Sequence, residues 1–178
     1  MLKMLIAVDG SDLSLDAVRH ALRLKAEGLD AQLVLANVQE PPSLYEMITV
    51  RDPDRLAGLG AGAGEHLLQA ARQLCDASGA DYEFEVASGE PAHTLVEMAE
   101  RHGCDAILAG VRGKGGSLGG GWLGSVSQEL MHVSTVPVTL VKHPDTPMPA
   151  AEDSDDQASA QAQPFTAERE PEPLQGLA

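Results

Sequence analysis

Residues 106–128 read AILAGVRGKGGSLGGGWLGSVSQ, and this stretch decides the fold class. The apolar run 106–109 predicts a buried strand. Ser125 and Gln128 have the S-x-x-Q spacing of a capping box, which predicts the start of a helix. The segment between strand and helix holds eight of the chain's 18 glycines, at Gly110, Gly113, Gly115, Gly116, Gly119, Gly120, Gly121 and Gly124. A strand that passes through such a loop into a helix is typical of α/β folds.

The same alternation extends along the first 143 residues. Ser11 is expected to cap the first helix, Pro91 suits the first turn of the third, and Pro137 ends the last. Strands are predicted at 4–8, 32–38, 82–87, 106–109 and 138–141, and apolar residues recur at helical spacing within 15–29, 67–78, 95–102 and 126–133. These elements predict a doubly wound α/β fold, a five-stranded parallel sheet with helices on both faces.

The character of each strand predicts its place in the sheet. Residues 82–86 alternate apolar and charged side chains, as an edge strand does, whereas the first and fourth strands are almost wholly apolar and suit the centre. These constraints favour the order 3-2-1-4-5. Ligands of open α/β sheets bind where the strand order reverses, so the loops 9–14 and 110–125 are the expected site.

A second glycine-rich run, residues 58–64, follows no predicted strand. We interpret it as a flexible connector that precedes the helix at 67–78.

Composition excludes several classes of protein. The chain has 178 residues and a formal net charge of -15, which argues against nucleic-acid binding and against an anionic membrane surface. Two cysteines cannot form a disulfide framework, and no apolar run approaches the roughly 18 residues of a membrane span. We therefore expect no membrane insertion and a cytoplasmic protein.

The C-terminal segment 144–178 differs from the rest. It carries eight acids, one base and six of the 11 prolines, so that its net charge is -7 and -8 remains for the other residues. So few large apolar residues cannot offset the entropy of ordering. We expect a domain over 1–143 followed by an acidic, proline-rich, disordered tail.

The glycine-rich loop has the chemistry of a phosphate site. Glycines let backbone N–H groups approach a phosphate, and a helix N-terminus adds free donors and partial positive charge. Arg112 and Lys114 supply cations, and Ser125 a hydroxyl. The loop is no Walker A motif, because Gly113-Lys114 is followed by another glycine. A loop that binds nothing is the alternative.

The motifs together resemble the universal stress protein family over about residues 1–143. The resemblance is carried by Val8-Asp9-Gly10-Ser11, Val38, Gly89-x-Pro91, Gly110-x-x-Gly113, Gly124-Ser125-Val126 and Val136-Pro137-Val138. It implies a nucleotide-binding α/β fold that dimerises through its last strand. The ATP-binding branch of this family carries G-x2-G-x9-G-[ST]. Here ten residues separate Gly113 from Gly124, and Gly119–Gly121 could absorb the additional one.

The resemblance also implies a set of binding residues for ATP. Mg²⁺ or Mn²⁺ could arrive with the nucleotide, held mostly by phosphates and water. Asp9 would lie by the adenine or ribose, Ala7 and Val8 would line the pocket, and the backbone of Val38 would hold the adenine edge. Ribose and phosphates would be surrounded by Gly110, Arg112, Gly113, Gly124, Ser125 and Val126.

Three functions remain open. The first is an ATP-binding regulatory stress-response protein whose nucleotide state modulates an unknown protein partner. The second is a slow ATP hydrolase, and the third is an interaction module that has lost nucleotide binding.

We predict no catalytic residues. We also predict no metal site built by protein ligands, because the six histidines do not have the spacing of metal ligands. Cys75 and Cys104 are expected in the core, whereas Trp122 could pack the loop or shield the nucleotide.

The strand 138–141 is predicted at the other edge of the sheet. An apolar edge favours pairing with another chain, so a homodimer through this strand is expected. The alternative is an edge covered by the tail.

Overall fold

The computed structural model describes residues 1–41, 53–113 and 123–142, with the backbone alone described over 53–61. The predicted tail, Trp122 and most of the glycine-rich loop lie outside these residues. The strands are β1 (Leu2–Ala7), β2 (Ala31–Gln39), β3 (Tyr82–Ser88), β4 (Ala106–Gly110) and β5 (Val138–Val141). The helices in the described part are α1 (Asp12–Ala26), α3 (Pro53–Ser78), α4 (Pro91–His102) and α5 (Ser125–Val133).

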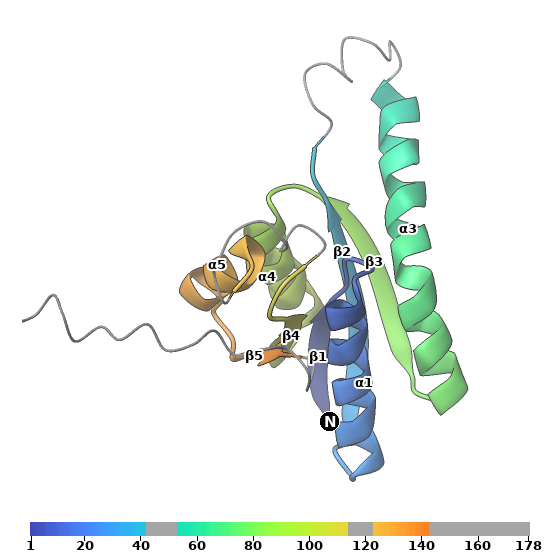
Figure 1. Ribbon diagram of the computed structural model, residues 1–178, viewed down its shortest axis with the longest axis vertical. Coiled ribbons are helices and arrows are strands. Elements are labelled where there is room, and N and C mark those ends of the chain that lie inside the picture. The colour runs from blue at the N-terminus through green and yellow to red at the C-terminus, as the bar shows by residue number, and fades with distance from the viewer. Residues whose placement is uncertain (42–52, 114–122, 143–178) are drawn as a thin grey trace, which may run out of the picture. The chain divides into compact units, whose positions relative to one another are not determined.

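The sheet has the order β3-β2-β1-β4-β5, and every neighbouring pair is parallel. This confirms the predicted topology. Helices α1 and α3 cover one face, and α4 and α5 cover the other (Figure 1). Each face has its own core, because alternate residues of β1 and β2 point to opposite sides: Ile6 and Leu35 pack toward α1 and α3, and Leu5 and Val34 toward α4 and α5.

Two helix starts follow the sequence closely. Ser11 is the N-cap of α1, and its side chain accepts a hydrogen bond from the backbone N–H of Ser14. Pro91 occupies the first turn of α4, whose N-cap is Glu90. The α4 helix ends at Gly103 in the left-handed conformation, with φ of 64°, a geometry that glycine adopts without steric cost.

The connector predicted at 58–64 is wrong, because these residues belong to α3, which begins at Pro53. The physical reason is visible at Gly64, where α3 lies directly on the sheet. A Cβ there would overlap Val86 and come within 2.8 Å of the Asn37 Oδ1 atom. The glycine therefore allows a close approach of helix to sheet, which the sequence pattern alone cannot distinguish from flexibility.

The capping box predicted at Ser125 is also wrong. The N-cap of α5 is Gly124, and Ser125 is its first helical residue. Within the described part of the chain, no side chain caps this helix. The chain enters the helix one residue earlier because the N–H of Gly124 is held by the carbonyl of Val111, 2.8 Å away.

Candidate functional site

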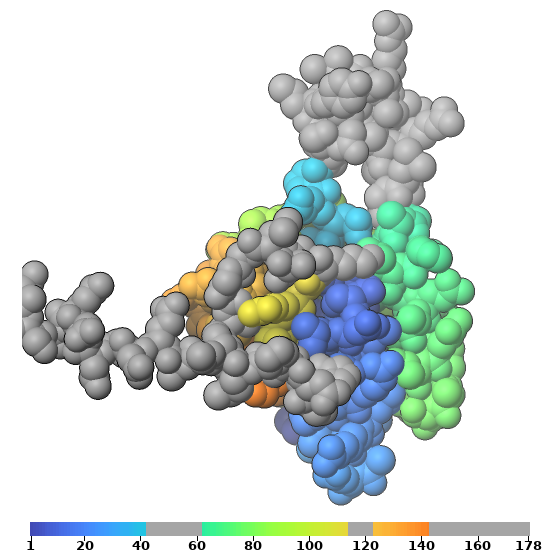
Figure 2. Space-filling model, in the orientation of Figure 1, coloured from blue at the N-terminus to red at the C-terminus, as the bar shows by residue number. Residues whose placement is uncertain are grey.

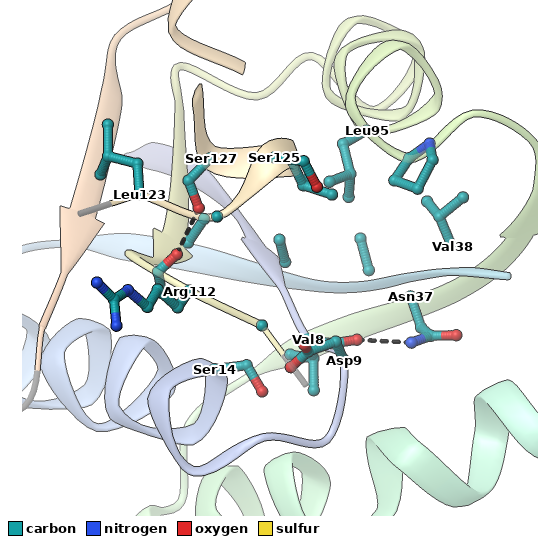
Figure 3. A pocket seen from close by; sticks show the side chains of 18 of the residues that line it. Val8, Asp9, Ser14, Asn37, Val38, Leu95, Arg112, Leu123, Ser125 and Ser127 are labelled. Carbon is teal, nitrogen blue, oxygen red and sulfur yellow. Dashed lines mark hydrogen bonds between the residues drawn. The ribbon is translucent and has the colours of Figure 1, made fainter. Parts of the chain in front are cut away.

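A cavity of about 480 Å³ opens at the carboxyl end of the sheet, where the strand order reverses between β1 and β4 (Figure 3). This volume lies in the range of small-ligand sites. The lining includes all ten residues that the sequence singled out: Ala7, Val8, Asp9, Val38, Gly110, Arg112, Gly113, Gly124, Ser125 and Val126. The fold thus brings residues from four separate segments to one place.

Asp9 links the two loops of the site. One carboxylate oxygen, Oδ1, accepts hydrogen bonds from the backbone N–H of Ser11 at 2.9 Å and from its hydroxyl at 2.6 Å. The other oxygen lies so close to Gly113 that a Cβ there would overlap it. The Asp9 carboxylate is therefore fixed between the start of α1 and the start of the glycine-rich loop.

The two ends of the glycine-rich loop are held together. The Gly124 N–H donates to the Val111 carbonyl, and the Ser127 hydroxyl donates to the Gly110 carbonyl at 2.8 Å (Figure 3). Gly110 also packs on the first turn of α1, where an added Cβ would come within 2.9 Å of the Leu13 backbone. This close packing presents the N-terminus of α5, which no described side chain caps, to the cavity. First-turn N–H groups of a helix can donate to an anion.

The wall also contains residues that sequence reasoning missed. Among them Asn37 carried a signal, since it is a polar residue inside the apolar run of the second strand, and the structure buries it to 2% exposure. Of the other lining residues, Ser14 and Leu123 lie in the two loops expected at the site, and Pro91 belongs to the Gly89-x-Pro91 motif. The rest carry no motif: Ala36, Glu40, Leu95, Ala109 and Ser127.

A group of ionisable side chains gathers where the start of α4 meets α5. Single ligand atoms of Glu90, His93 and Glu129 all lie within 4.8 Å of one another, a spacing that could hold a cation. The Glu90 carboxylate accepts the backbone N–H groups of Ala92 and His93 and lies 2.7 Å from His93 Nδ1. These bonds lower the pKa of Glu90, and the Glu90 carboxylate raises the pKa of His93. A helix cap with an ion pair therefore accounts for this group without a metal.

An all-parallel sheet of this order defines a doubly wound α/β protein, and the cavity of ligand size lies at its switch point. Sequence comparison assigns the chain to a family within this class of fold. The universal stress protein family matches residues 1–142. The chain therefore belongs to the universal stress protein family, whose members are stress-response proteins.

A curated relative agrees with this assignment, and solved structures share the fold. The universal stress protein YxiE of Bacillus subtilis is 33% identical over 147 residues, covering 79% of this chain and 98% of YxiE. The solved structure of the hypothetical protein MJ0577 has a TM-score of 0.67 at 23% identity, covering 81% of this chain and 97% of that one. A universal stress protein solved in complex with cAMP has a TM-score of 0.55 at 28% identity, covering 79% and 95%.

Among the described residues, no helix is long and apolar enough to cross a membrane.

Proposed function

We propose that this protein binds ATP in the cavity between β1 and β4, and that its nucleotide state modulates binding of a protein partner in a stress response. The observation that carries the proposal is that the N-terminus of α5, which no described side chain caps, opens onto the cavity next to Arg112 and Gly113. Helix N-termini bind phosphates through free N–H groups and the helix dipole. In a chain of net charge -15, these donors and Arg112 are where a polyanion would be held.

The opposite end of the cavity suits a base. Ala7, Val38 and Leu95 give it apolar walls, and the described Val38 backbone lies two residues beyond the last β1–β2 pair, Ala7 with Ala36. Adenine has a ring nitrogen that accepts a hydrogen bond beside an exocyclic amino group that donates one. A backbone N–H and C=O of one residue can pair with these two groups. The complex of a relative with cAMP supports an adenine nucleotide as the ligand.

The remaining binding residues complete the proposal. Asp9 would lie by the adenine or ribose, and ribose and phosphates would be surrounded by Gly110, Gly113, Gly124, Ser125 and Val126. Mg²⁺ or Mn²⁺ would arrive with the nucleotide, held mostly by phosphate oxygens and water.

The test is direct. The purified protein is denatured and any released nucleotide identified, and ATP binding to ligand-free protein is measured by calorimetry. Gly113→Ala, whose Cβ would displace the Asp9 carboxylate, should weaken ATP binding about tenfold, the loss of one good polar contact. Gly62→Ala is the matched control, because nothing lies within 4 Å of its Cβ and it is outside the cavity. Absence of released nucleotide together with no ATP binding would refute the proposal.

A separate assay of phosphate release from ATP measures turnover. Phosphate release at or above about 1 s⁻¹, the low end of ordinary enzyme rates, would instead favour an ATP hydrolase.

We further propose that the protein forms a homodimer through β5. This strand ends the sheet of the described residues, and Val138, Leu140 and Val141 remain half-buried rather than fully covered. Thr139 is exposed on it, so Thr139→Lys adds a charge at the edge without touching the core. Light scattering should give twice the chain mass for the wild type and the chain mass for the variant. A wild-type monomer would contradict the proposal.

A further inference from the structure

The hydrogen-bond ladder between β1 and β2 ends before the backbone bond that would come next in a regular parallel pair. Their register ends at Ala7 paired with Ala36, followed by one bond of 2.8 Å from the Val8 N–H to the Ala36 carbonyl. In a regular parallel ladder the next bond would run from the Val38 N–H to the Val8 carbonyl. That bond would extend the register by the pair Val8 with Asn37, and the register contains no such pair.

The Val8 carbonyl has a different donor. The side-chain amide nitrogen of Asn37, Nδ2, lies 2.6 Å from it (Figure 3). Asn37 is 2% exposed, so this bond is made inside the protein, where an unpaired carbonyl is costly. The side chain of Asn37 therefore stands where the backbone of Val38 would otherwise bind.

Neighbouring groups fix the orientation of the Asn37 amide. Its oxygen, Oδ1, accepts a hydrogen bond of 2.5 Å from the side-chain amide of Gln39, so its nitrogen faces Val8. The backbone carbonyl of Gln39 is itself held by the Gly89 N–H at 3.0 Å. On the α3 side, Gly64 packs close to Oδ1. These contacts leave the amide little freedom to turn over.

The backbone of Val38 is directed toward the space that β1 has left. Peptide groups of a strand alternate between its two neighbours, and Ala36 faces β1 because its carbonyl accepts from Val8. Val38, two residues on, faces the same side, and it lines the cavity. Its N–H and C=O therefore open onto the site.

We propose that Asn37 is a positioning residue, which satisfies the Val8 carbonyl in place of the Val38 N–H and so keeps that N–H available to the base of a bound nucleotide. The inference rests on the proposed function for the identity of the ligand. The class of ligand it selects is a purine with a ring nitrogen acceptor beside an exocyclic amino donor, as in adenine. Asn37 acts through Val38 and needs no contact with the nucleotide.

The first experiment measures Val38 directly. Hydrogen exchange of its amide is followed by nuclear magnetic resonance in the ligand-free wild type and in Asn37→Asp, which keeps the size of the side chain and loses its donor. The wild-type amide should exchange fast and become protected when ATP binds. In Asn37→Asp the Val8 carbonyl is free to take the Val38 N–H, so this amide should already exchange about tenfold more slowly without ligand.

The second experiment separates base from phosphate. Calorimetry compares ATP with inorganic tripolyphosphate, which lacks the base. Asn37→Asp should weaken ATP about tenfold, the effect of one hydrogen bond, and should leave tripolyphosphate within about twofold. Equal losses for both ligands would mean that Asn37 only supports the fold, and would overturn the inference.

Two variants that leave Asn37 in place test the same inference if Asn37→Asp does not fold. Gln39→Leu removes the bond that orients the amide and should give the same base-dependent loss at smaller size. Gln32→Leu is the control on the same strand, because its side chain bonds Glu83 and lies outside the cavity. Identical ATP affinities for the two variants would overturn the inference. Failure of the wild type to bind ATP would refute the proposed function, while the Val38 exchange rates would still decide the role of Asn37.

Discussion

Two alanine substitutions, two residues apart on α3, isolate the contact between this helix and the sheet. At Gly64 an added Cβ would overlap Val86 and come within 2.8 Å of Asn37 Oδ1, whereas at Gly62 it would meet nothing within 4 Å. Both glycines lie in the interior of α3, so both substitutions share the same gain in helix propensity.

The magnitudes follow from this difference. Replacing glycine by alanine inside a helix stabilises it by about 0.8–1 kcal/mol, and Gly62→Ala should show that gain in the free energy of unfolding. Gly64→Ala adds an overpacking cost of about 1–3 kcal/mol, because the atoms it meets belong to the partly buried Val86 and the buried Asn37 of a packed sheet. Since the propensity gain cancels between the two variants, Gly64→Ala should be less stable than Gly62→Ala by about 1–3 kcal/mol.

Urea unfolding followed by circular dichroism measures this difference, with the slope of the transition serving as a check that both variants unfold from the same native state. Each kcal/mol should also lower the midpoint of thermal unfolding by about 2–4 °C for a chain of this size. If Gly64→Ala is as stable as Gly62→Ala, α3 does not lie on the sheet as described.

Two further predictions concern titratable groups. The Glu90 carboxylate raises the pKa of His93 above its ordinary 6.5, so the imidazole resonances should titrate above that value, and Glu90→Gln should lower the midpoint. The pair stabilises the fold below the ordinary pKa of His93 and loses this effect as pH rises through the raised value. It also loses the effect as pH falls through the lowered pKa of Glu90. Burial raises the pKa of Cys75 and Cys104 to about 11, so iodoacetamide at pH 8 should alkylate them only after unfolding, and rapid labelling of the native protein would contradict their core positions.

The topology could be predicted because each strand carries its own evidence. The alternation of 82–86 indicates an edge and the apolar first and fourth strands indicate the centre, and the order 3-2-1-4-5, which the structure has, satisfies both constraints. The errors fall where two physical roles require the same residue. Glycine serves both loops and close helix packing, so 58–64 could not be recognised as part of α3. Serine occurs both at the N-cap of a helix and at its first helical position, so the sequence pattern places the start of α5 one residue too late.

Only part of the candidate site could be predicted from the sequence. Glycines and Asp9 form motifs, so their gathering around one cavity could be expected from the switch-point rule. Asn37 belongs to no motif, and its importance depends on a hydrogen bond to Val8, a residue 29 positions away. Such a bond follows from where β1 ends relative to β2, and strand ends are the least certain part of a prediction from sequence.

Nine of the 19 described residues that line the cavity are glycine, alanine or serine, whose side chains offer few groups to a ligand. If the first-turn N–H groups of α5 hold the phosphates, the hydroxyl of Ser125 matters less than its backbone. Ser125→Ala removes the hydroxyl alone. Ser125→Pro also removes one N–H, yet proline suits the first helical position.

The local geometry accepts that proline. The preceding Gly124 has φ of -70° and ψ of 158°, the extended conformation that a residue before proline requires. Ser125→Pro should therefore fold like Ser125→Ala but bind tripolyphosphate about tenfold more weakly, the loss of one charge-assisted hydrogen bond. Equal affinities of the two variants would show that side chains such as Arg112, and not the helix N-terminus, hold the phosphates.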